Sequence, residues 1–302
     1  MNLQFVADGV LTGAMIGLGA IGVTLTYSIL RFANFAQGEF IAWGAYFALL
    51  VATALGWLAG GSLTPVGPFS FGWGLIVALI VAMPLTGALA LCLDWVLFAR
   101  LREKASSITI VIASFGASMA LRSLLEFLFT SRPAYFTREL QIAIRLGWGV
   151  RATPDQLALV GLTAVLVLAL HVLLTRTQIG RSMRAVSENP ALARVAGVDV
   201  DQVVRVTWLL GGALACASGV MVGLTVQIRP FMGFDLLLPL FAAAILGGIG
   251  SVPGALVGGL IVGVAEAAAT PTVGAQWRAA VAFVLLIVML LARPTGLFGA
   301  RE

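Results

Sequence analysis

The sequence predicts an all-α polytopic membrane protein with about eight transmembrane segments, and three observations support this prediction. Of the 302 residues, 60% are hydrophobic and only 10% are charged, whereas soluble domains carry about 25% charged residues. Mean hydropathy is +1.05, and several apolar segments exceed the roughly 20 residues that a helix needs to cross a bilayer. These segments are apolar on every side, so they lack the alternation typical of membrane-barrel strands.

The apolar segments form one transmembrane domain over residues 1–302. They lie at residues 9–31, 38–58, 72–98, 106–128, 156–175, 203–226, 237–269 and 277–292. The connections between them are short, apart from the polar segments 129–155 and 176–202. The N-terminus lacks the basic region of a cleaved signal peptide, so we expect the first span to remain in the mature protein.

Basic residues predict the orientation, because Lys and Arg are enriched in the cytoplasmic loops of membrane proteins. If segment 237–269 enters and leaves by one face, eleven basic residues share one side, namely Arg31, Arg100, Arg102, Lys104, Arg176, Arg181, Arg184, Arg194, Arg205, Arg293 and Arg301. Six share the other side, namely Arg132, Arg138, Arg145, Arg151, Arg229 and Arg278. The excess predicts that 99–104, 176–202 and the C-terminus are cytoplasmic, and it indicates orientation rather than nucleic-acid binding.

The polar segment 176–202 interrupts the apolar sequence with a charged connection. Asn189 and Pro190 are typical of a helix N-cap and of the first helical position, and Gly197 can end a helix in the left-handed conformation. Together they predict a short helix over residues 190–196. It is either an ordinary element of a cytoplasmic loop or a coupling helix that docks onto a soluble motor subunit.

Two further segments interrupt apolar stretches. Residues 30–46 contain Asn34, Gln37 and Glu39, and the glycine-rich residues 245–259 cannot run as an unbroken helix. Such backbone is tolerated in a membrane only where protein or water surrounds it, and matched interruptions in two halves of a transporter mark its pathway. We therefore expect broken or re-entrant helices and hypothesise two pseudo-symmetric halves. The candidate pathway residues are Asn34, Gln37, Glu39, Gly247, Gly248, Gly250, Ser251 and Gly254.

Glu39 is the carboxylate of greatest interest, because a charged side chain on a single helix at membrane depth costs roughly 3 kcal/mol. At that depth it needs a partner, a helix N-terminus or a proton. Alternatively, Glu39 lies at the membrane interface and caps a helix. Arg122 and Glu126 are four residues apart on one predicted span, so we expect them to pair with each other.

The sequence lacks the motifs of common membrane-associated enzymes. It has no GxxxxGK[ST] phosphate-binding loop, so we do not expect it to hydrolyse ATP through that motif. A single histidine excludes a His-rich metal site and an HExxH metalloprotease. Ser118 and His171 form the one candidate hydrolase dyad, although a lone Ser and a lone His on apolar helices are more often packing residues. We expect no catalytic residue, no metal site and no cofactor.

Four stretches carry a family resemblance. They are GVTLTYSILRFANFAQGEFIAWGAY near the start, GRSMRAVSENPALARVAGVD in the middle, AAAILGGIGSVPGALVGGLIVGVAE, and the terminal RPTGLFG. In the same order and with similar spacing, they resemble the membrane permeases of branched-chain amino acid ABC importers. Within that family the resemblance is to the shorter, H-type permease, and it extends over essentially the whole chain.

The resemblance implies a non-catalytic permease subunit of an importer for branched-chain or related hydrophobic amino acids in the bacterial inner (plasma) membrane. The implied partners are a second, M-type permease, two cytoplasmic ATPase subunits, a periplasmic amino-acid-binding protein and the lipid bilayer, with no nucleic acid. The polar insert matches the family's ATPase-contacting loop. Its coupling residues would be Arg181, Arg184, Glu188, Asn189, Pro190, Arg194 and Gly197.

Some alternatives stay open from sequence. A stand-alone secondary transporter or channel explains the broken spans and Glu39 but not the capped helix, and a membrane hydrolase would rest on Ser118 and His171. The substrate is open between Leu, Ile or Val and urea, amides or aromatic compounds. The family usually has His at the position of Gln37, and Gln can hydrogen bond there but cannot titrate near neutral pH.

Overall fold

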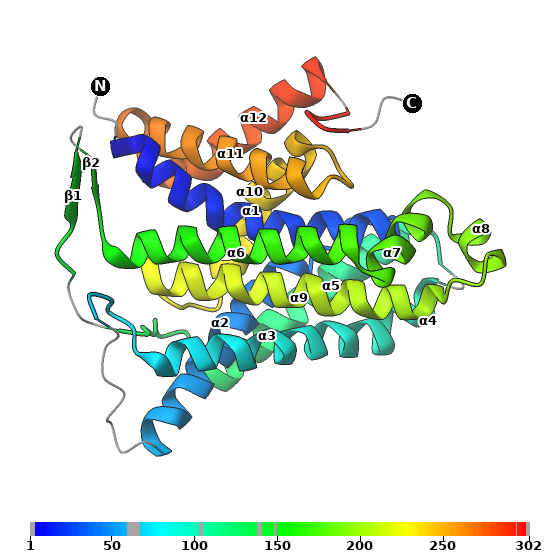
Figure 1. The fold of residues 1–302 in the computed structure, drawn as a ribbon, viewed down its shortest axis with the longest axis horizontal. Helices are drawn as coiled ribbons and strands as arrows, with labels where there is room; N and C mark the ends of the chain where they lie inside the picture. The colour runs from blue at the N-terminus through cyan, green and yellow to red at the C-terminus, as the bar shows by residue number, and fades with distance from the viewer. Residues whose placement is uncertain are drawn as a thin grey trace.

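The computed structural model describes residues 4–58, 67–102, 105–137, 141–147, 150–293 and 295–299, and these are almost entirely helical (Figure 1). Within them, eight helical segments are long and apolar enough to cross a membrane, which confirms the predicted fold class. They are α1 (Gln4–Leu30), α2 (Gln37–Leu58), α3 (Trp73–Leu93) with its continuation to α4 (Ala99–Arg102), α5 (Ser107–Phe129), α6 (Pro154–Arg176), α9 (Val200–Thr225), α11 (Val252–Val273) and α12 (Arg278–Ala292) with the 3-10 turn before it.

The apolar segment 237–269 is interrupted, as its glycines predicted. It consists of a shorter helix, α10 (Met232–Gly247), a turn, and α11. The turn contains Gly248 with φ 99° and Gly250 with φ 97°, a backbone region that side-chain-bearing residues rarely adopt. The glycines therefore break the helix where the sequence predicted an interruption.

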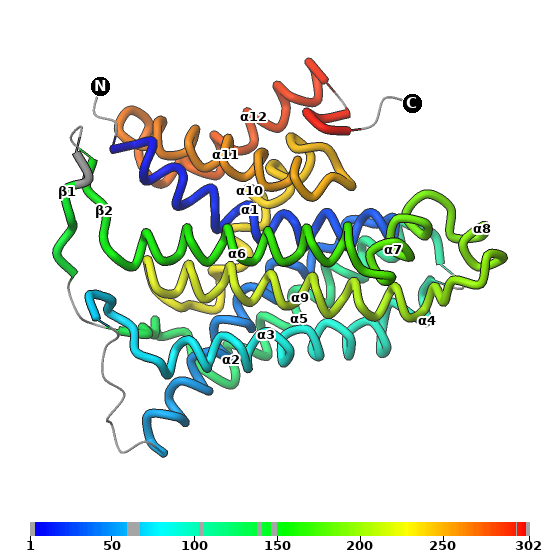
Figure 2. Tube along the Cα trace, viewed as in Figure 1, coloured from blue at the N-terminus to red at the C-terminus, as the bar shows by residue number. Residues whose placement is uncertain are grey.

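The remaining elements lie at the two ends of the bundle. Helices α7 (Gln178–Glu188) and α8 (Pro190–Val195) project at one end, together with the α10–α11 turn (Figure 2). The short antiparallel strands β1 (Ile144–Gly147) and β2 (Val150–Ala152) lie at the other end, near the start of α1 (Figure 1). Helix α4 lies at the same end as α7 and α8 (Figure 1), so segments 99–102 and 176–202 share an end, as predicted. Lys104, Arg138 and Arg301 lie outside the described residues.

Helices α1 to α3 correspond to α9 to α11 in an inverted arrangement. Helices α1 and α9 run in opposite directions (Figure 1), and each is followed by a non-helical break of equal length, 31–36 and 226–231. Helix α1 packs against α11 as α9 packs against α3, and α2 contacts α9 as α10 contacts α1. This is the arrangement of an inverted repeat, which many transporters share. It supports the hypothesis of pseudo-symmetric halves, but it matches the first break with 226–231 rather than with 245–259.

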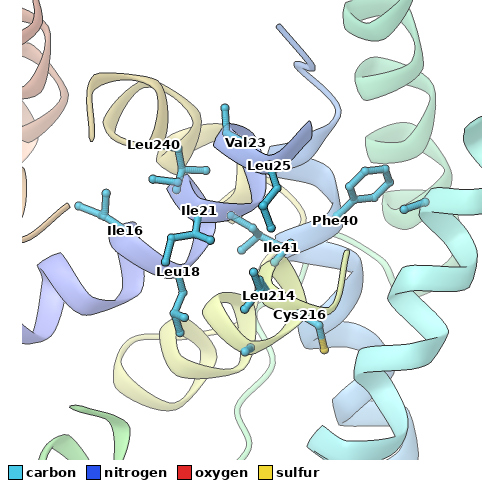
Figure 3. Packing of buried hydrophobic residues seen from close by; sticks show 14 of the residues in the cluster. Ile16, Leu18, Ile21, Val23, Leu25, Phe40, Ile41, Leu214, Cys216 and Leu240 are labelled. Carbon is cyan, nitrogen blue, oxygen red and sulfur yellow. The ribbon is translucent and has the colours of Figure 1, made fainter. Parts of the chain in front are cut away.

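The two halves meet where α2 and α10 begin. A Cβ atom on Gly38 would lie 2.5 Å from the carbonyl oxygen of Gly233, and one on Gly233 would lie 1.9 Å from the carbonyl oxygen of Gly38. Both distances are shorter than real Cβ contacts, so the backbones touch directly and neither position accommodates a side chain. Around this crossing, Ile21 of α1, Ile41 of α2 and Leu240 of α10 converge in the apolar core (Figure 3).

Small residues also bring α1 against α11. A Cβ on Gly13 would lie 2.7 Å from Cα of Leu260, and one on Gly259 would lie 2.5 Å from Cα of Gly17. In lipid, where apolar side chains gain little by leaving the solvent, such close backbone contact is a main source of helix association. The contact therefore holds α11 of the second half against α1 of the first half.

Candidate functional site

The first break, 31–36, buries polar residues within the bundle. Asn34, Gln37 and Glu39 are 1%, 0% and 1% exposed. The side-chain oxygen of Asn34 accepts a hydrogen bond from the backbone N–H of Ala36 at 3.1 Å. The backbone carbonyl oxygen of Asn34 accepts one from the backbone N–H of Gln37 at 3.3 Å. Asn34 thus forms the local turn that starts α2.

Aromatic rings and one hydroxyl fix the break against its neighbours. The ring of Phe32 lies 5.2 Å from that of Phe98, and the ring of Phe35 lies 5.2 Å from that of Phe241. The backbone N–H of Phe35 donates to Ser114 Oγ on α5 at 3.2 Å. The non-helical backbone is therefore enclosed by protein, as its position inside an apolar chain requires.

Gln37 fills the space between α1 and α9. Its Nε2 donates to the carbonyl oxygen of Gly211 at 3.1 Å, and a Cβ on Gly22 would lie 2.4 Å from the same nitrogen. Its Oε1 is buried and has no hydrogen-bond partner within the described residues. The amide therefore holds α2 to α9 on one side and has an unused acceptor on the other.

Glu39 forms a buried ion pair with Arg122 of α5. Its Oε1 accepts hydrogen bonds from Arg122 Nη2 at 2.6 Å and Nε at 3.2 Å, and from Ser118 Oγ at 3.0 Å. The expected pairing of Arg122 with Glu126 is wrong, because the Arg122 side chain reaches across to α2 rather than along its own helix. Of the alternatives for Glu39, the structure supports burial with a partner, and breaking such a pair costs about 3–5 kcal/mol.

The start of α10 completes this cluster. The guanidinium carbon of Arg122 lies 4.2 Å from the ring centre of Phe234 and 5.1 Å from that of Phe231. Arg122 therefore joins α5 to both α2 and α10 at the pseudo-symmetric crossing. This role of Arg122 was not predicted from the sequence, although an Arg inside an apolar span is itself a signal of function.

The candidate hydrolase dyad does not form. Ser118 is buried and donates its hydroxyl to Glu39. His171 is exposed on α6, and α6 is not among the helices packed against α5. Ser118 thus helps to position a carboxylate, and nothing in this arrangement resembles a nucleophile with its base.

The second set of predicted residues lies at the tight turn between α10 and α11, away from the first break. A Cβ on Gly247 would lie 2.1 Å from the carbonyl oxygen of Gly254, and Ser251 Oγ accepts from Gly254 N–H at 3.1 Å. Gly250 is exposed, with no atom within 4 Å of a Cβ placed on it. Since Gly247 follows Gly233 by fourteen helical residues, this turn lies about 21 Å along α10 from the central crossing.

Residues 295–299 cover part of that turn. The backbone N–H groups of Leu297 and Phe298 donate to the carbonyl oxygens of Leu246 and Gly247 at 2.9 and 3.0 Å. These bonds satisfy carbonyl groups that the end of α10 leaves free. The structure thus brings Asn34, Gln37 and Glu39 together but places the 247–254 residues in a separate location.

The polar insert contains two helices. The predicted helix over 190–196 is confirmed to within one residue as α8: Asn189 Oδ1 accepts from the N–H groups of Ala191 and Leu192 at 3.0 and 3.1 Å, and Gly197 closes the segment with φ 84°. Helix α7 was not predicted. It buries Gly180, Met183 and Val186, whose spacing is that of one helix face, and it exposes Arg181, Arg184 and Glu188.

Arg31 connects this insert to the first break. It is a non-glycine residue in the left-handed region, with φ 58°. Its guanidinium donates to the carbonyl oxygen of Ser187 in the last turn of α7. A cation at the end of a helix satisfies a free carbonyl and interacts favourably with the helix dipole. The end of α1, the break and α7 are therefore mechanically linked.

An inverted repeat whose broken helices begin inside the bundle is the architecture of a solute-transporting membrane protein. Residues 5–290 match the model of the family described as branched-chain amino acid transport system / permease component, and the chain belongs to this family. It is therefore a membrane permease subunit, as its resemblance implied.

Two relatives align with nearly the whole chain. The high-affinity branched-chain amino acid transport system permease protein LivH of Escherichia coli (strain K12) is 32% identical, over 99% of this chain and 96% of its own. The corresponding protein BraD of Pseudomonas aeruginosa is also 32% identical, with the same coverage. Among solved structures, PsaBC from Streptococcus pneumoniae in complex with Fab aligns with 97% of this chain and 95% of its own, at 16% identity and a TM-score of 0.49.

Proposed function

We propose that this permease moves branched-chain or related hydrophobic amino acids across the bacterial inner membrane as part of an ATP-driven importer. The observation that carries the proposal is the family match over residues 5–290, together with full-length similarity to permeases named for this transport. We propose a second, M-type permease, two cytoplasmic ATPases and a periplasmic binding protein as its partners. ATP hydrolysis belongs to the separate subunits, since the sequence has no phosphate-binding loop.

The end that carries α7 and α8 is, in this proposal, cytoplasmic, and the C-terminus lies on the same side. The excess of basic residues at this end supports the orientation. Helix α8 exposes Leu192 and Val195 by 67% and 88%, and Arg194 lies exposed between them. Exposed apolar anchors with a charged rim suit a groove on a soluble subunit.

The coupling residues in this proposal are those of the insert. Arg181, Arg184, Glu188 and Arg194 contact the ATPase, while Asn189, Pro190 and Gly197 fix the ends of α8. When ATP closes the two ATPases, they push on α7 and α8. Because Arg31 bonds to the end of α7, this displacement reaches the break that precedes α2.

The pathway in this proposal runs beside the interrupted helices. Asn34, Gln37 and Glu39 lie near its middle, and the residues of the α10–α11 turn, Gly247, Gly248, Gly250, Ser251 and Gly254, lie towards its cytoplasmic end. Movement of the break shifts the start of α2 against α10, and this shift alternates access between the two sides. The unpartnered oxygen of Gln37 and the burial of Glu39 support a role for the first group.

The deciding experiment is co-purification from the native operon, followed by ATPase assays in proteoliposomes with the binding protein. We expect a second permease and two ATPases to accompany the chain, and leucine to stimulate ATP hydrolysis. If the companions co-purify but leucine does not stimulate ATP hydrolysis, the chain is part of an importer whose substrate is an amide, urea or an aromatic acid. A chain that purifies alone and moves solute on an ion gradient would contradict the proposal.

A further inference from the structure

Arg122 places a guanidinium inside an apolar span and leaves one edge of it open. Its Nε and Nη2 donate to Glu39, whereas Nη1 makes no hydrogen bond with any described residue, and 13% of the side chain is exposed. The residue lies seven positions before the end of α5, about 10 Å along the helix. Facing lipid there would cost roughly 3 kcal/mol, so the open edge faces a partner subunit or a water-filled space.

Exposed apolar side chains lie next to this guanidinium. The rings of Phe231 and Phe234 lie over the guanidinium and are 46% and 43% exposed. Met119, one helical turn before Arg122 on α5, is 55% exposed. The surroundings therefore offer one cationic group with hydrogen-bond donors next to exposed apolar surface, which suits a ligand that carries an anionic group beside an aliphatic chain.

A second, opposite charge lies directly behind the guanidinium. All three hydrogen bonds to Glu39 reach Oε1, and Oε2 is buried without a partner within the described residues. A buried carboxylate oxygen without a donor is costly. An adjacent cation and an unsatisfied carboxylate oxygen form the electrostatic complement of a zwitterion, in which an ammonium group and a carboxylate are separated by one carbon atom.

We propose that Arg122, between Phe231 and Phe234, binds the α-carboxylate of the transported amino acid. Glu39 orients the guanidinium in the empty site, and its Oε2 binds the substrate's ammonium group when the substrate's carboxylate displaces part of the ion pair. This inference rests on the proposed function and deepens it, because an Arg–carboxylate pair selects amino acids over urea, uncharged amides or amines.

A thiol-protection experiment tests occupancy directly. In the assembled importer, Met119→Cys is introduced with Cys92→Ser, and its reaction with a charged methanethiosulfonate is timed. We expect saturating leucine to slow the reaction at least fivefold, and leucinol, which lacks the carboxylate, to leave it unchanged. Equal slowing by both compounds, or no slowing in an importer that transports leucine, would overturn the subsite while leaving the proposed function intact.

Substitutions test the charges. Arg122→Gln leaves a buried carboxylate unpaired and can prevent folding, so the matched variant is Glu39→Gln with Arg122→Gln, which removes both charges. We expect the double variant to assemble with its companions, lose leucine protection, and transport leucine roughly tenfold to a hundredfold more slowly, the range for a charge-assisted hydrogen bond.

Arg176→Gln, at the exposed end of α6, is the control for loss of one arginine. Wild-type leucine transport by the double variant would overturn the inference, whereas failure of the unaltered importer to move leucine would instead overturn the proposed function.

Discussion

The guanidinium of Arg31 donates a hydrogen bond to the backbone carbonyl of Ser187 and so joins the end of α1 to the end of α7. Segments 156 residues apart in the sequence thereby share one charge-assisted contact. On one side of it lies the amphipathic insert, and on the other the six-residue break that leads to Glu39. It is a direct side-chain connection between the proposed coupling surface and the break that leads to the polar centre.

Arg31→Gly removes that contact without straining the backbone, since glycine adopts φ 58° freely. We expect the amount of leucine moved per ATP hydrolysed to fall roughly tenfold, the lower range for a hydrogen bond to a charged group. The ratio is measured in proteoliposomes. The control is Arg205→Ala, at the same end, whose side chain bonds within its own helix and to no other residue that the structure describes. Unchanged coupling in Arg31→Gly would show that the contact transmits nothing.

Arg184→Glu combined with Arg194→Glu reverses two exposed charges on α7 and α8. We expect ATP hydrolysis to become uncoupled from leucine transport, because the reversed charges repel the ATPase surface that they are proposed to contact. Membrane insertion stays intact, since both side chains are exposed. Arg132→Glu with Arg145→Glu, exposed at the opposite end, is the matched control. If the insert variant keeps coupled transport, the assignment of α7 and α8 to the ATPase is wrong.

Gly233→Ala forces a methyl group into the backbone of Gly38. Because backbone atoms cannot yield as a flexible side chain does, we expect the two helices to separate and the protein to lose about 2–4 kcal/mol of stability, within the range of overpacking and lost contacts. Thermal unfolding in detergent measures the effect. Gly116→Ala, on a helix face with no atom within 4 Å of the added carbon, is expected to be neutral or slightly stabilising.

Gly250→Leu tests whether the α10–α11 turn lines the pathway. Alanine and leucine carry the same backbone strain at φ 97° and differ only in side-chain volume, so Gly250→Ala is the matched control. We expect the leucine variant to block transport with the ATPases still bound and the alanine variant to retain much of the flux. Leucine uptake measures the flux through each variant, and co-purification shows whether the ATPases remain bound. Equal flux through both variants would remove the turn from the path.

Much of the fold follows from the sequence, because long apolar segments in lipid have one satisfactory structure. The caps of α8 were predictable from Asn189 and Gly197, since such caps are local. The break at Asn34 and the turn at Gly250 were also indicated by their residue types. Residues 227–236 lay outside the predicted spans, but the correspondence of 226–231 to the first break was not predicted, because it depends on spatial symmetry.

The polar centre was only partly predictable. A partner was one of the alternatives predicted for Glu39, but that partner lies on another helix, and a rule for residues four apart favoured Glu126 for Arg122. Helical spacing describes neighbours on one helix and says nothing of contacts between helices. In a bundle held by backbone contacts such as that of Gly38 with Gly233, those contacts decide which polar groups meet.

Gly38 is synthesised 195 residues before Gly233, which corresponds to roughly 10–40 s at a rate of about 5–20 residues per second. During that interval five of the eight described spans are synthesised, namely those that contain α2, α3, α5, α6 and α9. The polar start of α2 must wait in the membrane without the helix that will cross it, although Arg122 of α5 becomes available earlier to neutralise Glu39. Because both partners of the ion pair belong to the first half, Glu39 can be neutralised before the second half is made.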